Sequence, residues 1–509
     1  MSGLLTNAQM RAVEGAAIAL GRVSGLDLME RAGQGVVAAI FATWPALRCD
    51  AQRAVVLCGP GNNGGEGYVV ARLLHAWGWQ VFVHATEAGG ADAAIAAQAF
   101  VAAGGKVLPL SYDAVRASLR GASVMFDSLL GIGQLRNADA LLKPILQAKA
   151  ALGAGDLRWV AVDLPTGLNA DSGRLTGALV CAADLTVTFH RAKIGHHLGL
   201  GPALCGRLVV VDLGISSGQT QGLPLTAPAA QLGKGVGHKF SHGHAVILGG
   251  PVGQGGAARL AARGALRVGA GLVTLACPPP SLAENATRLD AVMLRAVEDG
   301  ADLNALLQDA RITALCLGPG LGLDARAAGL VRAALQAGHL RPLPTVLDAD
   351  ALTLLSRDPT LASQLHPACV LTPHGGEFAR LFPDIAAMLS EGSDAKASYS
   401  KVDATRAAAR RVGCGVLFKG ADTVIACPDG HCALNAATYE AQVPWLATAG
   451  AGDVLAGMIC GLLARGFTPQ VATETGAWLH RAAAQQFGAG LIAEDLPDQL
   501  PAVFRALGL

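Results

Sequence analysis

The sequence has few aromatic and few charged residues, and it lacks the patterns of several protein classes. Aromatic residues make up 4% of the 509 residues and charged residues 15%, with 39 basic and 38 acidic side chains. This near-neutral balance argues against a protein that binds nucleic acid or a membrane surface mainly through charge. Glycine, proline or polar residues interrupt the longer uncharged runs, so we expect no membrane span.

The eleven cysteines form no C-x-x-C pair, which argues against the common zinc and dithiol motifs. Charged residues, among them Arg11, Glu14 and Arg22, interrupt the first thirty positions, so the apolar core of a signal peptide does not form. We therefore expect reduced thiols and a cytoplasmic location.

Glycine and small apolar residues are abundant instead. Sixty-five glycines and an apolar content of 52% are typical of a turn-rich α/β enzyme. Apolar strands that alternate with helical segments predict parallel sheets covered by helices on both faces. The predicted strands are Ala54–Cys58, Gln80–Ala85, Ser123–Asp127, Trp159–Asp163, Leu185–His190, Arg207–Asp212, Ala245–Gly249, Ala314–Leu317, Thr345–Leu347, Ala368–Leu371 and Val416–Lys419.

A chain of this length is expected to form more than one domain. Residues 216–235 are rich in Ser, Gly, Gln and Pro and show no periodicity, so we interpret them as a linker between domains 1–215 and 236–509. Ligands of parallel α/β sheets bind outside the carboxyl ends of the strands. Polar residues of the first half that fall at such ends are Asn62, Asn63, Glu66, Asp127, Asp163 and Thr166.

The stretch LATAGAGDVLAG, Leu446–Gly457, predicts a tight turn that leads into a helix. The N–H groups of Gly450, Ala451 and Gly452 would be free to hold a phosphate there. Asp453 is then either a helix cap or a catalytic base, and the stretch alone does not decide between them.

The second half carries a combination of motifs that resembles ADP-dependent NAD(P)H-hydrate dehydratases of the ribokinase-like fold. The matching pieces are a GG-x-x-G-like stretch at Gly249–Ala257, GAGLVT, GPGLG, DADAL, TPHGGE, KGADT and GDVLAG. The first half resembles NAD(P)H-hydrate epimerases, whose domain is Rossmann-like. It matches them in LMERAG, GPGNNGGEG, DSLLGIG, VDLPTGLNADSG and the TF-x-x-x-K-x-G segment at Thr188–Gly195.

The resemblance implies two three-layer α/β domains that repair hydrated NADH and NADPH. The first would interconvert the R and S epimers, and the second would dehydrate the S form with ADP, accompanied by Mg²⁺, and release AMP and phosphate. The dehydratase residues implied are Asp453 as catalytic base and substrate contact, Ala257, Gly320 and His374 as further hydrate contacts, and Lys419, Gly420, Ala421, Asp422, Thr423 and Gly452 as nucleotide contacts.

For the epimerase, the resemblance implies K⁺ bound by Asn63, Asp127 and Thr166, whose oxygen atoms suit a hard cation. Asp127 and Asp163 are the candidates for proton transfer. The implied substrate contacts are Asn62, Asn63, Gly64, Gly65, Glu66, Gly131, Ile132, Gly133, Gln134, Leu135, Arg136, Asn137 and Asp163. A symmetric homo-oligomer is also expected.

The sequence departs from the family pattern at a few positions. Glu66 stands where Asp is usual and Thr166 where Ser is frequent, and both changes keep the functional group. Gln134, Leu135 and Arg136 follow DSLLGIG where some family members carry a lysine, so a lysine acid there is not carried over. Ala449 and Ala451 replace Gly and a hydroxyl residue in the dehydratase loop, which removes a possible hydroxyl contact.

Other interpretations of the same residues stay open. Asp163 could cap a turn, and His374 could be satisfied by backbone groups. Glu377 is interpreted as a helix N-terminal residue stabilised by the dipole, and His196 and His197 as structural or surface residues. At the level of function, the rivals are a ribokinase-type kinase with a stable phosphorylated product, and a first half that only binds a ligand.

Overall fold

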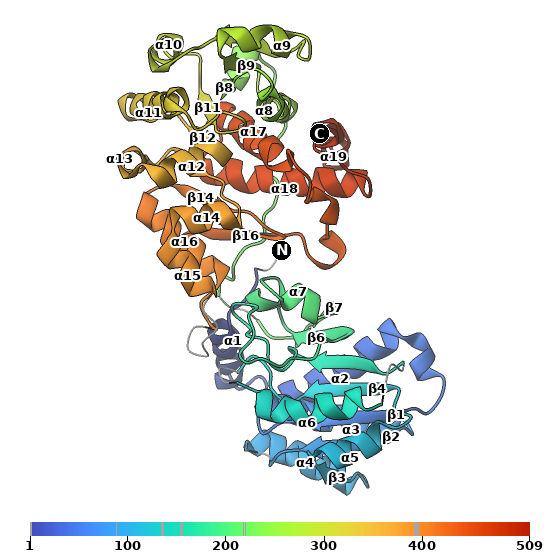
Figure 1. The fold of residues 1–509 in the computed structure, drawn as a ribbon. Coiled ribbons are helices and arrows are strands. Elements are labelled where there is room, and N and C mark those ends of the chain that lie inside the picture. Colours follow the sequence, from blue (N-terminus) through green and yellow to red (C-terminus); the bar gives the residue numbers. More distant parts are fainter. Residues whose placement is uncertain are drawn as a thin grey trace. The chain divides into compact units, whose positions relative to one another are not determined.

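The computed structural model describes residues 3–87, 89–133, 137–152, 156–216, 218, 220–390 and 397–509. The chain divides into two compact units (Figure 1). The N-terminal unit comprises Met1–Pro224 together with Glu391–Ser400, and the C-terminal unit comprises Leu225–Ser390 and Lys401–Leu509. Among the residues described, no helix combines the length and apolarity that crossing a membrane requires. All eleven cysteines are free thiols.

The N-terminal unit is built on a sheet of seven parallel strands in the order β3-β2-β1-β4-β5-β6-β7. Its strands are β1 (Arg53–Cys58), β2 (Gln80–Ala85), β3 (Val107–Pro109), β4 (Val124–Ser128), β5 (Arg158–Val162), β6 (Leu185–Phe189) and β7 (Arg207–Val211). Its helices are α1 (Asn7–Ala19), α2 (Gly25–Thr43), α3 (Asn62–Ala76), α4 (Ala91–Ala102), α5 (Tyr112–Leu119), α6 (Asp139–Ala150) and α7 (Gly201–Leu204).

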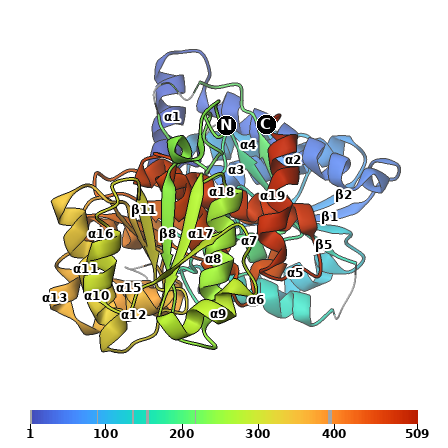
Figure 2. The ribbon, with the colours of Figure 1, turned by 90° about the horizontal axis from the view of Figure 1, so that it is seen from above.

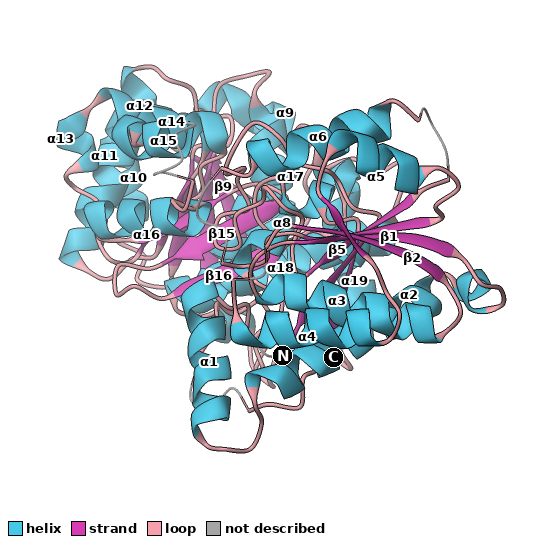
Figure 3. Ribbon diagram, turned by 90° about the horizontal axis from the view of Figure 1, so that it is seen from below, coloured by secondary structure: helices cyan, strands magenta, loops and turns pink. Residues whose placement is uncertain are grey.

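Alternation along β1 explains the three layers of this unit. Ala54, Val56 and Cys58 pack into the core beneath α2, α3 and α4, while Val55 and Leu57 pack beneath α5 and α6. Figure 3 shows these two groups of helices on opposite faces of the sheet. The predicted parallel sheet with both faces covered is confirmed.

The C-terminal unit holds a nine-stranded sheet in the order β10-β9-β8-β11-β12-β13-β14-β15-β16. Its strands are β8 (His244–Leu248), β9 (Leu272–Cys277), β10 (Met293–Ala296), β11 (Ala314–Leu317), β12 (Thr345–Leu347), β13 (Cys369–Leu371), β14 (Gly415–Phe418), β15 (Asp422–Ala426) and β16 (Cys432–Ala436). Strands up to β14 pair in parallel, but β15 and β16 are antiparallel. The fully parallel sheet expected for this half is therefore wrong at one edge, because KGADT forms a hairpin turn.

Two groups of helices cover this second sheet. Apolar residues of β8 and its neighbours pack beneath α8, α17, α18 and α19, and Figure 2 shows α10 to α13 on the other side of β8. The helices are α8 (Gly255–Arg267), α9 (Leu282–Ala286), α10 (Gly300–Leu306), α11 (Ala325–Leu340), α12 (Ala349–Arg357), α13 (Pro359–Ala362), α14 (Gly375–Leu381), α15 (Pro383–Ser390), α16 (Lys401–Val412), α17 (Ala451–Ala464), α18 (Pro469–Phe487) and α19 (Asp495–Ala506).

Small residues let α17 approach α8 closely. A Cβ atom at Gly457 or Gly461 would clash with the carbonyl oxygens of Ala261 and Ala265, and one at Gly264 would press on Val454. The backbones are therefore in direct contact, which sets the N-terminal turn of α17 beside the N-terminal part of α8. This packing fixes the position of Asp453.

Candidate active sites

A cavity of about 570 Å³ lies at the carboxyl edge of the first sheet, beside the neighbouring strands β1 and β4. This is the point where the strand order reverses, the usual ligand position in such sheets. The cavity brings together seven residues predicted from the sequence: Asn62, Asn63, Glu66, Gly131, Ile132, Gly133 and Asp163. It also contains Glu14 and Lys193, which the sequence interpretation did not assign to the site.

The glycine-rich loop after β1 packs against the loop after β4 through backbone atoms. A Cβ at Gly59 would clash with the carbonyl of Leu129, and one at Gly64 with that of Gly59. The helix α3 then begins at Asn62 without a side-chain cap, so its first N–H groups lie at the cavity. Gly64 and Gly65 are buried in that first turn, and a Cβ at Gly65 would meet the Met29 side chain.

Asp163 is the most constrained acid of this site. Its backbone is left-handed with φ 67°, a conformation that is costly outside glycine. Its Oδ1 accepts hydrogen bonds from Lys193 Nζ and Thr188 Oγ1, both at 2.9 Å, and Oδ2 accepts one from the Ile132 N–H at 3.2 Å. Burial alone would raise the pKa of Asp163, but the Lys193 ammonium and these hydrogen bonds hold it below its ordinary value.

His196 holds the backbones of Asp163 and Lys193 together. It is buried in a 3₁₀ turn (Ile194–His196), and its ring links the Asp163 carbonyl at 2.9 Å to the Lys193 N–H at 2.9 Å. Burial lowers the pKa of His196 to about 4, so the ring is neutral and donates through Nε2. The structural interpretation of His196 agrees with this geometry, although the pair with His197 lies near a turn rather than on a strand.

Two further carboxyl groups share the cavity. Burial and the nearby Asp163 raise the pKa of Glu66 well above its ordinary value, and burial raises that of Glu14 as well. With its amide oriented by its partners, Asn63 donates to Glu66 Oε2 at 3.1 Å and to the Val162 carbonyl at 3.0 Å. The site therefore combines an ionised pair with two acids that hold their protons more tightly.

Asp127 lies behind the cavity rather than in its wall. It is fully buried, and Thr166 donates to it through its hydroxyl at 2.7 Å and its N–H at 2.8 Å. The Leu130 carbonyl is 3.4 Å from the same hydroxyl. Burial raises the pKa of Asp127, and no cationic side chain pairs with it among the residues described. Two of the three expected K⁺ ligands, Asp127 and Thr166, are thus in contact with each other, whereas the third, Asn63, donates to Glu66.

The remaining predicted contacts of this half lie elsewhere. Asn137 is exposed and accepts from the Asp139 N–H at 2.7 Å, at the start of α6. Gln134, Leu135 and Arg136 lie outside the described residues.

The second candidate site lies at the carboxyl edge of the C-terminal sheet, around the start of α17. Gly450 has φ 88° and precedes the helix, as the tight turn predicts. The N–H of Ala451 contacts the Thr448 carbonyl at 3.4 Å, so it is less available than expected. Asp453 accepts no hydrogen bond from any residue described, so it does not act as a cap.

Asp453 stands among other acids and one lysine. Burial first, then the nearby Asp348, Asp350 and Glu377, raise its pKa to about 6, while Lys419 opposes the shift. Lys419 Nζ donates to Asp348 at 2.8 Å and lies 3.9 Å from Glu377. Although burial opposes the charge, these acids raise the pKa of Lys419.

Gly452 leaves room for this lysine. A Cβ at Gly452 would lie 3.3 Å from Lys419 Nζ and 3.9 Å from Asp348 Oδ2. The ammonium group thus lies opposite the first turn of α17. Asp348 belongs to the DADAL motif but was not assigned a role, and no local spacing reveals its contact with a residue 71 positions away.

The hairpin between β14 and β15 presents the predicted nucleotide residues. Thr423 Oγ1 bonds both backbone groups of Gly420, and Lys401 Nζ donates to Asp422 Oδ1 at 2.6 Å and to the Lys419 carbonyl at 3.1 Å. Ala421 forms the exposed tip between them. Lys401 was not predicted, and it braces the hairpin from α16.

Ala257, Gly320 and His374 complete the predicted set. A Cβ at Gly320 would lie 3.4 Å from that of Ala257, so these two positions adjoin. His374 caps α14: its Nδ1 accepts from the Gly376 N–H at 3.0 Å, and its own N–H donates to Glu377 at 2.8 Å. Its side chain is still 56% exposed, which leaves the ring accessible.

Comparisons with known proteins match both halves of the chain. A family model described as NAD(P)H-hydrate dehydratase matches residues 245–502, and one described as the N-terminus of YjeF-related proteins matches residues 25–195. The bifunctional NAD(P)H-hydrate repair enzyme of Coxiella burnetii is 35% identical over 517 residues, covering 97% of this chain and 98% of the relative. Its counterpart from Escherichia coli is 34% identical over 494 residues, covering 92% and 88%.

The comparison with solved structures also finds a match over about half of the chain. The ADP/ATP-dependent NAD(P)H-hydrate dehydratase from Bacillus subtilis, co-crystallised with ATP and Mg²⁺, is 28% identical with a TM-score of 0.44. It covers 56% of this chain and 99% of that chain.

Proposed function

Because the chain belongs to the bifunctional NAD(P)H-hydrate repair enzymes, we infer that it repairs hydrated NADH and NADPH in two steps. The N-terminal unit epimerises the R and S hydrates, and the C-terminal unit dehydrates the S form with ADP. The matches to both family models support this division: the match at 25–195 lies in the N-terminal unit, and the match at 245–502 lies in the C-terminal unit except for residues 391–400.

The dehydration removes the added water through a phosphate ester. The ring hydroxyl attacks the β-phosphorus of ADP and AMP leaves. The C–O bond then breaks, phosphate departs with the oxygen, and loss of a ring proton restores the double bond of NAD(P)H. Such a phosphoryl transfer needs an aligned hydroxyl, an acceptor for its proton and stabilisation of the transferring group.

Asp453 is the proposed acceptor of the hydroxyl proton. The observation that supports this role is a carboxyl group with no hydrogen-bond donor among the residues described, a pKa of about 6 and a position in the first turn of α17. A base with this pKa is mostly ionised at neutral pH and can still bind a proton. The Gly452 N–H and the Lys419 ammonium would stabilise the transferring group.

The nucleotide is proposed to lie against the hairpin of Lys419–Thr423, and the hydrate against Ala257, Gly320 and His374. No cluster of three or more His, Cys, Asp or Glu side chains fit for a metal is found in the part of the chain that the structure describes. A Mg²⁺ ion bound with the nucleotide would neutralise phosphate charge, and the Asp348 carboxylate supplies oxygen atoms of the kind that it prefers.

In the epimerase site, Asp163 and Lys193 are proposed to move protons during reversible ring opening, with Glu66 and Glu14, whose pKa values burial raises, as further acids. The Asp127 carboxylate is buried and has no cationic partner among the residues described. Together with the Thr166 hydroxyl and the Leu130 carbonyl beside it, it offers the oxygen atoms that suit a potassium ion. Bound K⁺ would neutralise Asp127 and fix the loop that carries Gly131. A homo-oligomer and a cytoplasmic location stay predictions.

The most informative test is an assay on separated epimers. Pure R hydrate with ADP should give NADH, AMP and phosphate in equal amounts, at a rate that rises when K⁺ replaces Na⁺. A stable phosphorylated hydrate would contradict the dehydratase assignment and favour a kinase. Conversion of the S form alone, with R consumed only at its uncatalysed rate, would contradict the epimerase assignment.

A further inference from the structure

A second large cavity, of about 720 Å³, lies in the C-terminal unit away from the candidate dehydratase site. Its wall includes Gly269 and Val292, which come before β9 and β10, so it opens at the amino ends of these strands. Along α17, Arg465 in this cavity follows Asp453 by twelve residues, which is about 18 Å at 1.5 Å per residue.

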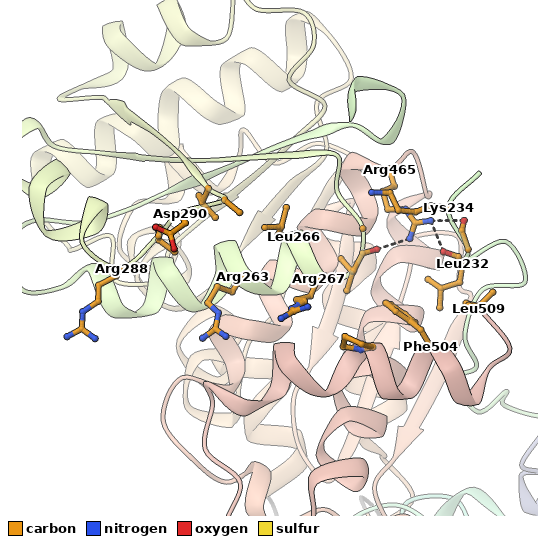
Figure 4. Close-up of a pocket in the computed structure, with 17 residues that line it drawn as sticks. Leu232, Lys234, Arg263, Leu266, Arg267, Arg288, Asp290, Arg465, Phe504 and Leu509 are labelled. Atoms are coloured by element: carbon orange, nitrogen blue, oxygen red, sulfur yellow. Dashed lines mark hydrogen bonds between the residues drawn. The ribbon is translucent and has the colours of Figure 1, made fainter. Parts of the chain in front are cut away.

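The cavity is strongly basic. Five basic side chains line it against one acidic side chain, Asp290 (Figure 4). We call it the basic pocket and define it by Lys234, Arg263, Arg267, Arg288 and Arg465.

The basic side chains differ in how they are neutralised. Arg263 and Arg267 share one carboxylate, Asp498, each at 2.8 Å. Lys234 and Arg288 have no ion-pair partner within the described ranges. The pocket therefore keeps positive charge that its own acids leave unpaired.

Arg465 and Lys234 converge on one spot. Arg465 donates to the carbonyls of Leu232 at 2.6 Å and Val268 at 2.7 Å, which fixes its guanidinium. A Cβ at Gly269 would lie 3.3 Å from Arg465 Nη1 and 3.3 Å from Lys234 Cδ, so both basic side chains pass over the same glycine. Burial and this neighbouring arginine lower the pKa of Lys234. Two like charges held together this way gain from a bound anion.

The other part of the wall is apolar. Leu266, Leu289, Val292 and Phe504 line the pocket beside the basic residues, and Figure 4 shows Phe504 below Lys234 and Arg465. An inorganic anion would leave this apolar surface unused. A ligand that joins a phosphate to a ring would use both, since arginine side chains bind phosphate and an aromatic face packs on a ring. The volume falls in the range of small-molecule sites, about 300–1,000 Å³.

We propose that the basic pocket binds a phosphate-bearing ligand of mononucleotide size, with its phosphate on the basic residues and its ring on the Phe504 wall. This site is separate from the dehydratase chemistry and does not depend on it.

Hydrogen exchange of the full-length chain, read by mass spectrometry, separates this site from the catalytic one. AMP serves as the probe and inorganic phosphate as the comparison. AMP should slow exchange in residues 263–269 and 288–292, in addition to the hairpin 419–423. At AMP a hundredfold above its Kd, ligand-sensitive openings should slow by up to about 100-fold.

The variant Lys234→Gln/Arg288→Gln should lose protection in 263–269 and 288–292 and keep it in 419–423. The matched control is Arg357→Gln, an exposed arginine at the end of α12, which should behave as the wild type. Equal protection by phosphate alone would overturn the role of the Phe504 wall. Absence of protection with AMP, or protection that survives the double substitution, would overturn the site. A basic pocket already protected without ligand, together with a double variant that dissociates in light scattering, would identify it as an interface between copies and likewise overturn the proposal.

Discussion

The two candidate active sites occupy the same edge of their sheets but hold their acids in different ways. Asp163 in the N-terminal unit is tied to Lys193, Thr188 and a backbone N–H, and its pKa is lowered. Asp453 in the C-terminal unit accepts no hydrogen bond from the residues described, and its pKa is raised to about 6. The lysine that could have paired with it, Lys419, is bound by Asp348 instead.

This difference fits the two reactions. Reversible proton movement in an epimerase suits a pair in which a proton can be passed between neighbouring groups. Phosphoryl transfer suits a single base kept free for one incoming hydroxyl. The carboxyl edge of the sheet thus supports two kinds of chemistry, and the hydrogen-bond and ion-pair partners of Asp163 and Asp453 decide which one.

Removing the free base should have the largest effect. Asp453→Asn keeps the shape but cannot accept the proton, so kcat for ADP-dependent dehydration should fall about 10²–10⁴-fold. Epimer exchange, followed by chromatography of the two hydrates, should be unchanged. The matched control is Asp302→Asn, which removes another carboxylate from a helix first turn, in α10. Full dehydration by the Asp453 variant would contradict its assignment.

Breaking the tied pair should affect both epimerisation and stability. Lys193→Met leaves Asp163 buried without its cation, which costs about 3–5 kcal/mol of unfolding free energy and should abolish epimerisation. Adding Asp163→Asn removes the unpaired charge and should recover much of the stability but none of the activity. A Lys193→Met chain that epimerises normally would show that the pair is only structural.

The free base should also reveal itself through pH. With a pKa of about 6, Asp453 is ionised in about one-tenth of molecules at pH 5, so dehydration should rise roughly tenfold between pH 5 and neutrality. The measurement is kcat for the S hydrate against pH. Epimerisation should not follow this curve, because the pKa of Asp163 is lowered. A flat dehydration profile would contradict the base.

The raised pKa of Asp453 also predicts that Asp453→Asn stabilises the folded chain at neutral pH although it removes activity. The folded pKa lies above the ordinary value of 3.8, so ionisation opposes folding, and its cost is absent below pH 4 and complete above pH 6. Asp453→Asn should therefore be more stable than the wild type at pH 7, by about 1–3 kcal/mol, and equal near pH 4. Calorimetry of the C-terminal unit's transition measures this difference.

The smallest effect is expected at the proposed cation site. Thr166→Val removes the hydroxyl that contacts Asp127 at 2.7 Å but keeps the volume. Epimerisation should then need more K⁺ and should recover when K⁺ is raised. Thr188→Val is not a neutral control because Thr188 contacts Asp163. Thr176→Val is preferable, because the Thr176 hydroxyl donates to the Gly167 carbonyl and Thr176 does not line the cavity. Loss that K⁺ does not restore would count against the cation.

Much of this comparison could be predicted from sequence, and the missing part has a physical reason. The bounds predicted for β2, β11 and β12 from their apolar runs agree with the structure, because buried parallel strands have continuous apolar sequences that end at polar loops. The hairpin of β15 and β16 was missed because Thr423 and Asn435 interrupt its apolar pattern.

The polar partners were harder to predict than the motifs. Lys193 contacts Asp163 across 30 positions, and Lys419 contacts Asp348 across 71, so only the fold brings them together. Glu14 comes from α1, before any site motif. The Asp453 carboxyl was left open between cap and base, and its lack of a hydrogen bond within the described chain favours the base.

The central claim is that each unit holds one complete and independent site. The direct test mixes equal amounts of the Asp453→Asn and Asp163→Asn chains with pure R hydrate and ADP, and records the absorbance of reduced nicotinamide. Neither variant alone should form reduced nicotinamide from R hydrate faster than uncatalysed epimerisation allows, whereas the mixture should form it faster because the first variant supplies S hydrate to the second. A mixture no faster than its parts, with the dehydratase of the Asp163 variant intact on S hydrate, would contradict the claim.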